Sequence, residues 1–144
     1  MRYADKFFDE IYYFPNKYND EIHFVNLYAA IKYKFEDGVD DGFYFGKTQD
    51  KVLEDFKIIL KYLVEELKDF YIEYWDEKNA LDFYNVDEFW EFIEKNNIDI
   101  FDDTVSLWQL NLYRNKEQLK LPQNIPEYIH QIFEPYLFCE LKTQ

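Results

Sequence analysis

The stretch "TQDKVLEDFKIILKYLVEELKDF", residues 48–70, predicts the most regular element of the chain. Its apolar residues recur every three or four positions, which is the spacing of one buried helical face. These residues are Val52, Leu53, Phe56, Ile59, Leu60, Leu63, Val64, Leu67 and Phe70. Thr48 is placed to cap the helix, and Asp50 lies in its first turn, near the positive end of the helix dipole. The pattern continues through Trp75, so we expect either one long helix or two helices separated by a kink.

The same periodicity extends outward to the rest of the chain. Residues 21–37 predict a largely buried central helix, and residues 86–97 predict an amphipathic helix. Residues 104–113 fit a helix or an alternating strand, and we predict a helix there. Residues 124–138 predict a last helix, with Pro126 near its start and a kink or an end at Pro135.

Few residues interrupt these patterns, because the chain holds three glycines and four prolines among 144 residues. This length is typical of one domain with a core of its own. The sequence therefore predicts an all-α fold, a single-domain helical bundle of about five to seven helices that spans residues 1–144.

The composition describes an acidic protein that is rich in aromatic residues. Asp and Glu number 30 against 16 Lys and Arg, for a net charge of -14, and aromatic residues make up 22%. This charge repels nucleic acid and anionic membranes and attracts basic proteins. No apolar run approaches the roughly 18 residues of a membrane span, and the start of the chain lacks a signal-peptide pattern. With the single cysteine, Cys139, these features lead us to expect a cytoplasmic protein.

The glycines lie together in "DGVDDGFYFGKT", residues 37–48, which is the one segment that approaches a ligand loop. As a phosphate-binding loop it is one residue short and carries bulky aromatic residues where the backbone must approach phosphate. As a calcium loop it places Asp37 and Asp41 correctly, but Val39 and Thr48 occupy positions that should supply oxygen ligands. We expect a turn followed by a helix cap.

No other catalytic or metal-binding pattern is present. His23 and His130 are too far apart in sequence to form a metal-binding motif, and no basic residue lies beside Cys139. Adjacent acidic residues arise by chance in so acidic a chain. We therefore expect a protein that is not an enzyme and that uses no cofactor and no metal.

The segment "DEFWEFIEKNNIDIFDD", residues 87–103, concentrates seven acids and one lysine among aromatic residues. At 100° per residue the aromatic side chains fall on one helical face and the acids on the other. In the loop that follows, the apolar residues either lie beside the acids on the surface or point inward. Carboxylates steer and pair with basic partners, and exposed aromatic residues anchor them. The predicted partner-binding residues are first Asp87, Glu88, Glu91, Glu94, Asp99, Asp102 and Asp103, and second Asp37, Asp40, Asp41, Phe43 and Tyr44.

In its size, its charge and clusters such as "DEFWEFIEKNNIDIFDD", the chain resembles the bacterial immunity proteins that neutralise polymorphic or contact-dependent growth-inhibition toxins. The resemblance implies that it binds a cognate basic toxin domain, often a nuclease, and covers the active site or an adjacent surface. The alternatives are a nucleic-acid-mimicking inhibitor of a DNA- or RNA-processing enzyme, a structural or interaction subunit, and a small enzyme or calcium-binding domain.

Overall fold

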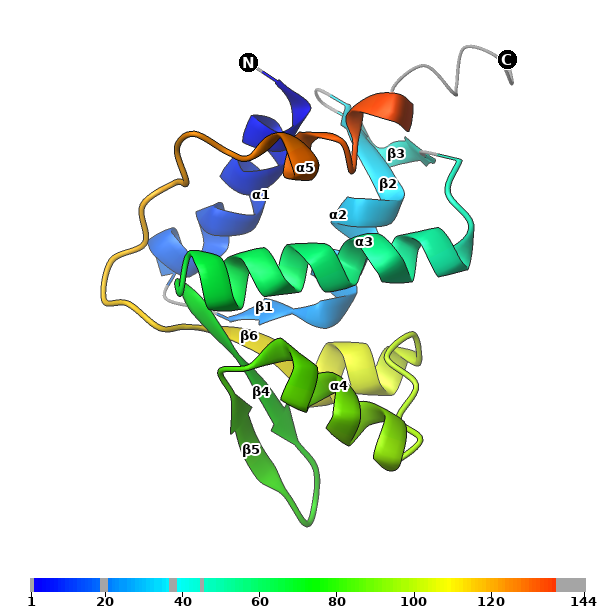
Figure 1. Ribbon diagram of the computed structural model, residues 1–144, viewed down its shortest axis with the longest axis vertical. Coiled ribbons are helices and arrows are strands. Elements are labelled where there is room, and N and C mark those ends of the chain that lie inside the picture. The colour runs from blue at the N-terminus through cyan, green and yellow to red at the C-terminus, as the bar shows by residue number, and fades with distance from the viewer. Residues whose placement is uncertain (1, 19–20, 37–38, 45, 137–144) are drawn as a thin grey trace.

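The computed structural model describes residues 2–18, 21–36, 39–44 and 46–136 and corrects the predicted fold (Figure 1). The all-α prediction is wrong, because four strands form an antiparallel sheet in the order β1-β6-β4-β5, and β2 and β3 form a separate hairpin. Helices pack around the sheet, so the fold is mixed α and β. Figure 1 shows α4 alongside the β4–β5 hairpin at one end of the molecule, with α1 and α5 at the other.

The helices are α1 (Tyr3–Tyr18), α2 (Phe24–Lys32), α3 (Gln49–Lys61), α4 (Val86–Lys95) and α5 (Glu127–His130). Short helical turns of wider or tighter pitch are η1 (Tyr62–Glu66), η2 (Val105–Gln109) and η3 (Glu134–Tyr136). The strands are β1 (Ile22–His23), β2 (Tyr33–Glu36), β3 (Val39–Tyr44), β4 (Phe70–Trp75), β5 (Ala80–Phe83) and β6 (Leu110–Arg114).

The predicted helix over 48–70 is right in its first part and ends earlier than expected. Thr48 caps α3 as predicted, since its hydroxyl accepts a hydrogen bond from the backbone N–H of Lys51 at 3.2 Å. The helix widens into η1 and stops at Lys68, whose φ of 57° is incompatible with a continuing helix. The continuation of the helix through Trp75 is wrong, because residues 70–75 are strand β4.

A buried carboxylate fixes the start of β4. Asp69 accepts a hydrogen bond from the Tyr12 hydroxyl at 2.6 Å and pairs with the Lys116 ammonium at 2.6 Å. Its backbone carbonyl accepts from Asn115 N–H at 2.8 Å. This junction joins α1 to the turn before β4 and the turn after β6, and so sets the register of the two central strands.

Two further predictions change in the same way. The central helix predicted over 21–37 is confined to α2, because residues 33–36 form β2 and pair with β3. The segment 104–113 is helical through η2 and then becomes β6, so the helix predicted there is wrong for residues 110–113. Strand β6 lies in the middle of the sheet, between β1 and β4.

The inner face of the sheet belongs to the core. In β4, Phe70, Ile72 and Tyr74 are buried, and Ile72 lies opposite Leu112 of β6. Helix α1 packs on this side, with the Tyr12 ring edge-on to Phe70 at 5.3 Å. The alternate residues of β4 therefore point to the outer face.

Candidate binding surfaces

Helix α4 carries four of the first predicted partner-binding residues, Asp87, Glu88, Glu91 and Glu94. Asn85 caps it by accepting a hydrogen bond from Glu88 N–H at 2.9 Å, and Glu65 accepts from Val86 N–H at 3.2 Å. The ring of Phe89, fully buried, contacts Phe83 of β5 at a centroid distance of 5.5 Å. The helix is therefore fixed to the core along one face.

The opposite face of α4 is a row of carboxylates, called here the α4 acidic row, formed by Asp87, Glu88, Glu91 and Glu94. All four are exposed, and none takes part in an ion pair between described residues. The two acids in the first turn lie near the positive end of the helix dipole, which stabilises them. The row is available to a cationic partner without first breaking an internal contact.

The acids after α4 have local structural duties. Asp99 accepts a hydrogen bond from Phe101 N–H at 2.9 Å, and Asp102 accepts from Thr104 N–H at 2.9 Å. These bonds cap the turn that leads into η2. Asp103 is exposed, as are Asp99 and Asp102.

The apolar residues of this turn face the protein. Ile100 is buried, and the half-buried ring of Phe101 packs on Tyr28 at 4.9 Å. Of the two arrangements considered for this loop, the structure has the one in which the apolar residues point inward. The acids are therefore the most exposed side chains of the turn.

The second predicted set is described only in part. Asp37 lies outside the described residues. Asp40, Asp41, Phe43 and Tyr44 lie in β3, whose backbone pairs with β2 through Lys34 opposite Phe43. Within the segment predicted as a turn, residues 39–44 thus form one strand of a hairpin.

A third surface, which the sequence analysis missed, is the outer face of the four-stranded sheet. The Tyr71 ring stacks on Tyr84 at a centroid distance of 5.0 Å and on Tyr113 at 6.0 Å, with interplanar angles of 26° and 20°. These three residues, the tyrosine ladder, cross the sheet from the end of β5 through β4 to β6. Tyr84 is 56% exposed, so the ladder is open to a partner at one end.

Acids adjoin the ladder on the same face. Glu73 of β4 lies directly opposite Asp82 of β5, and its other neighbour is Asn111 of β6. Burial, then the charges of Asp82 and Glu21, raise the pKa of the Glu73 carboxyl. The Asn111 amide in turn lies 2.5 Å from Nδ1 of His23 on β1. The outer face thus combines a row of rings with a row of polar groups.

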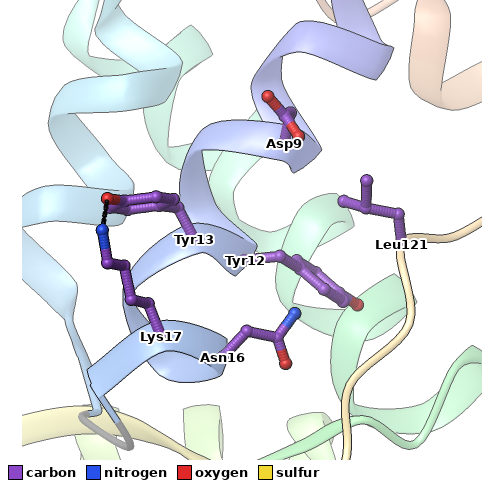
Figure 2. A pocket seen from close by; sticks show the side chains of 6 residues that line it. All are labelled: Asp9, Tyr12, Tyr13, Asn16, Lys17 and Leu121. Atoms are coloured by element: carbon purple, nitrogen blue, oxygen red, sulfur yellow. Dashed lines mark hydrogen bonds between the residues drawn. The ribbon is translucent and has the colours of Figure 1, made fainter.

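Figure 2 shows a surface hollow between α1 and the segment around Leu121. Its volume is about 270 Å³, and it is lined by Asp9, Tyr12, Tyr13, Asn16, Lys17 and Leu121. Most of its polar groups have partners, because Lys17 donates to the Tyr13 hydroxyl at 2.8 Å and Asn16 accepts from Leu119 N–H at 3.3 Å. The Tyr12 hydroxyl serves the Asp69 junction. Because most of the polar groups that line the hollow already have partners, we interpret it as a gap in packing and not as a binding site.

Lys47 and Asp55 form an ion pair at 2.9 Å in which both side chains are fully buried. Burial lowers the pKa of the Lys47 ammonium, and Asp55 opposes that effect. The ammonium also donates to the Ile31 carbonyl at 3.3 Å and lies 5.3 Å from the centre of the Phe133 ring. The pair joins α2, α3 and the C-terminal turn inside the core, away from the surface.

Among the described residues, no group of three His, Cys, Asp or Glu side chains is arranged to hold a metal ion. Likewise, none of the helices in the described ranges is both long and apolar enough to cross a membrane. His130 is buried 4.0 Å from Glu134, and Cys139 lies outside the described residues.

No protein-family model, no curated protein and no solved structure matches the chain. The function is therefore inferred from the chemistry of these surfaces.

Proposed function

We propose that this protein is an acidic inhibitor that binds a cognate basic protein, of the kind found among toxins with nuclease activity, and covers its active site or substrate-binding surface. The observation that carries the proposal is the α4 acidic row, Asp87, Glu88, Glu91 and Glu94, exposed and without internal ion pairs in the described part of the chain. Because its net charge is -14, the whole molecule also attracts basic proteins.

The support of α4 favours a binding role. Phe89 lies against Phe24 of α2 at 5.7 Å, and Trp90 lies edge-on to Phe56 of α3 at 6.4 Å, so the helix is held by aromatic contacts with two other helices. A rigid element loses little conformational entropy when a partner binds. Carboxylates held this way raise the rate of encounter with a basic surface and fix its orientation.

The proposed mechanism is steric and electrostatic occlusion. A nuclease binds phosphate through Lys and Arg, and the carboxylates of the α4 acidic row would pair with the same cations. Acids alone give attraction that is weak and sensitive to salt. Stable inhibition therefore also needs buried anchors, which exposed aromatic residues such as Tyr84 can supply.

The first experiment is capture of partners from the native host by the tagged protein at low and at high salt, with identification by mass spectrometry. The proposal predicts recovery of one basic protein that stays bound at high salt and whose activity the purified protein inhibits. Recovery of an acidic or neutral partner alone, or of only the protein itself, would contradict the proposal. Recovery of a host enzyme that processes nucleic acid would favour mimicry instead.

The captured partner then tests the α4 acidic row directly. The variant Asp87→Asn/Glu88→Gln/Glu91→Gln/Glu94→Gln removes four charges from one face, and we expect the association rate to fall about tenfold with a weaker dependence on salt. The matched control removes four exposed acids elsewhere, Asp9→Asn/Glu10→Gln/Glu66→Gln/Glu117→Gln, at equal net charge. Equal slowing in both variants would show that net charge, and not this face, drives binding.

A further inference from the structure

The outer face of the sheet places two acids between aromatic rings. Along β4, Tyr71, Glu73 and Trp75 point to the same side, and successive members are about 7 Å apart by strand geometry. Asp82 of β5 lies opposite Glu73, and Tyr84 stacks on Tyr71. The acid pair therefore has the tyrosine ladder on one side and Trp75, which is 55% exposed, on the other.

This arrangement is unfavourable in the protein alone. Like charges directly opposite each other on neighbouring strands repel. Neither Glu73 nor Asp82 has an ion pair within the described ranges, and Glu21 adds to the negative charge around Glu73. A local conflict of this kind is typical of a functional site, where a ligand resolves it.

The surroundings identify the charge and the shape of that ligand. It must be cationic, because it faces paired carboxylates, and flat, because it lies between rings that can stack. A second copy of this chain is a poor candidate, since each copy carries a net charge of -14. A metal ion is also poorly served, because no described group of three acidic, His or Cys side chains converges.

We propose that the outer face of the sheet binds an arginine side chain of the basic partner, with Glu73 and Asp82 pairing with the guanidinium and the exposed rings of Tyr84 and Trp75 flanking it. A guanidinium is planar, stacks on aromatic rings and donates two parallel hydrogen bonds, whereas an ammonium is a compact, strongly hydrated charge. This inference relies on the proposed function for the partner protein, and it specifies the side chain that the partner inserts.

Short peptides test the inference without the partner. The probes are acetyl-Gly-Arg-Gly-Arg-Gly-amide and its lysine and citrulline analogues, titrated into the full-length, isotope-labelled protein and followed by NMR. We expect the arginine peptide to bind roughly threefold or more tightly than the lysine peptide, and the uncharged citrulline peptide to bind weakest. Chemical shifts should change at the amides of Tyr71, Glu73 and Asp82 and at the Trp75 indole.

Variants locate the binding. Glu73→Gln/Asp82→Asn should weaken the arginine peptide about tenfold, and Tyr84→Leu should reduce the preference for arginine over lysine. The control Asp9→Asn/Glu10→Gln removes the same charge from α1 and should keep that preference. Equal affinity for arginine and lysine, no detectable binding, or equal losses in the sheet and α1 variants would overturn the inference.

The two proposals fail separately. A captured basic protein that binds Glu73→Gln/Asp82→Asn as tightly as the unchanged chain would support the inhibitor function and refute the arginine site. Selective arginine-peptide binding without any basic partner from the host would retain the site and refute the inhibitor function.

Discussion

The outer faces of α4 and of the sheet both display carboxylates, but the two surfaces are built differently. On α4 the acids come from one continuous helix and stand apart from the rings, and the two in its first turn are favoured by the helix dipole. On the sheet, Glu73 and Asp82 come from two strands, lie opposite each other and adjoin the tyrosine ladder. The first surface suits long-range attraction, and the second suits close contact with one cation.

The same difference explains why the acids of α4 could be found from the sequence and those of the sheet could not. Helical periodicity places residues 87, 88, 91 and 94 together from their spacing alone. The pair Glu73 and Asp82 exists only because of the β4–β5 register, and a shift of β5 by one residue would send Asp82 to the other face.

The largest expected effect comes from removing the side chain of Phe89, which supports both surfaces. Phe89 is fully buried and contacts both Phe24 of α2 and Phe83 of β5. The substitution Phe89→Ala leaves a cavity and should lower the free energy of unfolding by about 3–5 kcal/mol, measured by chemical denaturation.

The control for that substitution is Glu91→Ala, on the exposed face of the same helix, which should change the free energy of unfolding by less than about 0.5 kcal/mol. A loss of similar size in both variants would show that α4 is not anchored through Phe89.

A smaller effect should destabilise α4 and leave the sheet unchanged. Asn85 caps α4 through Glu88 N–H, so Asn85→Ala should cost about 1 kcal/mol, and Asn85→Ser should restore most of it. Hydrogen exchange should increase at the first-turn amides of α4 and remain unchanged at Ile72 in β4. If serine destabilises as much as alanine, the cap is not the source of the effect.

Helices α3 and α4 were predictable from the sequence because capping residues and apolar periodicity agreed. Thr48 caps α3, and α4 buries Val86, Phe89 and Ile93 as its pattern indicated. The exposure of Asp87, Glu88, Glu91 and Glu94 followed from the same pattern.

The sheet was missed for two physical reasons. Turns that usually need glycine are made here by Lys68, Asn97 and Asn124, with φ of 57°, 50° and 55°, so the low glycine content did not imply long helices. In addition, residues 70–75 carry aromatic residues at positions that fit both a helical and an alternating pattern. The contact of Asp69 with Tyr12 and Lys116, which are distant in sequence, starts the strand.

The smallest expected effects come from replacing one glutamate by glutamine on each surface. The two replacements should change the free energy of unfolding in opposite directions. Glu73→Gln removes half of a like-charged pair and should raise the free energy of unfolding at pH 7 by about 0.5 kcal/mol. Glu88→Gln removes a carboxylate from the first turn of α4 and should lower it by a similar amount, about 0.3–1 kcal/mol. Both values are measured by chemical denaturation.

The pH dependence of the free energy of unfolding should show that Glu73 destabilises the fold only when its carboxylate is ionised. Because burial, Asp82 and Glu21 raise the pKa of Glu73 in the folded state, the folded protein binds this proton more tightly than the unfolded chain. The ionised carboxylate therefore destabilises the fold above the raised pKa, and that penalty disappears as pH falls through it toward the unfolded value of about 4.3. The gain in the free energy of unfolding caused by Glu73→Gln should therefore be present at pH 7 and lost once the pH has fallen to the pKa of the unfolded chain. A Glu73→Gln variant that is less stable at pH 7 would mean that Glu73 already has a cationic partner within the chain, and no conflict would remain on the sheet for an arginine to resolve.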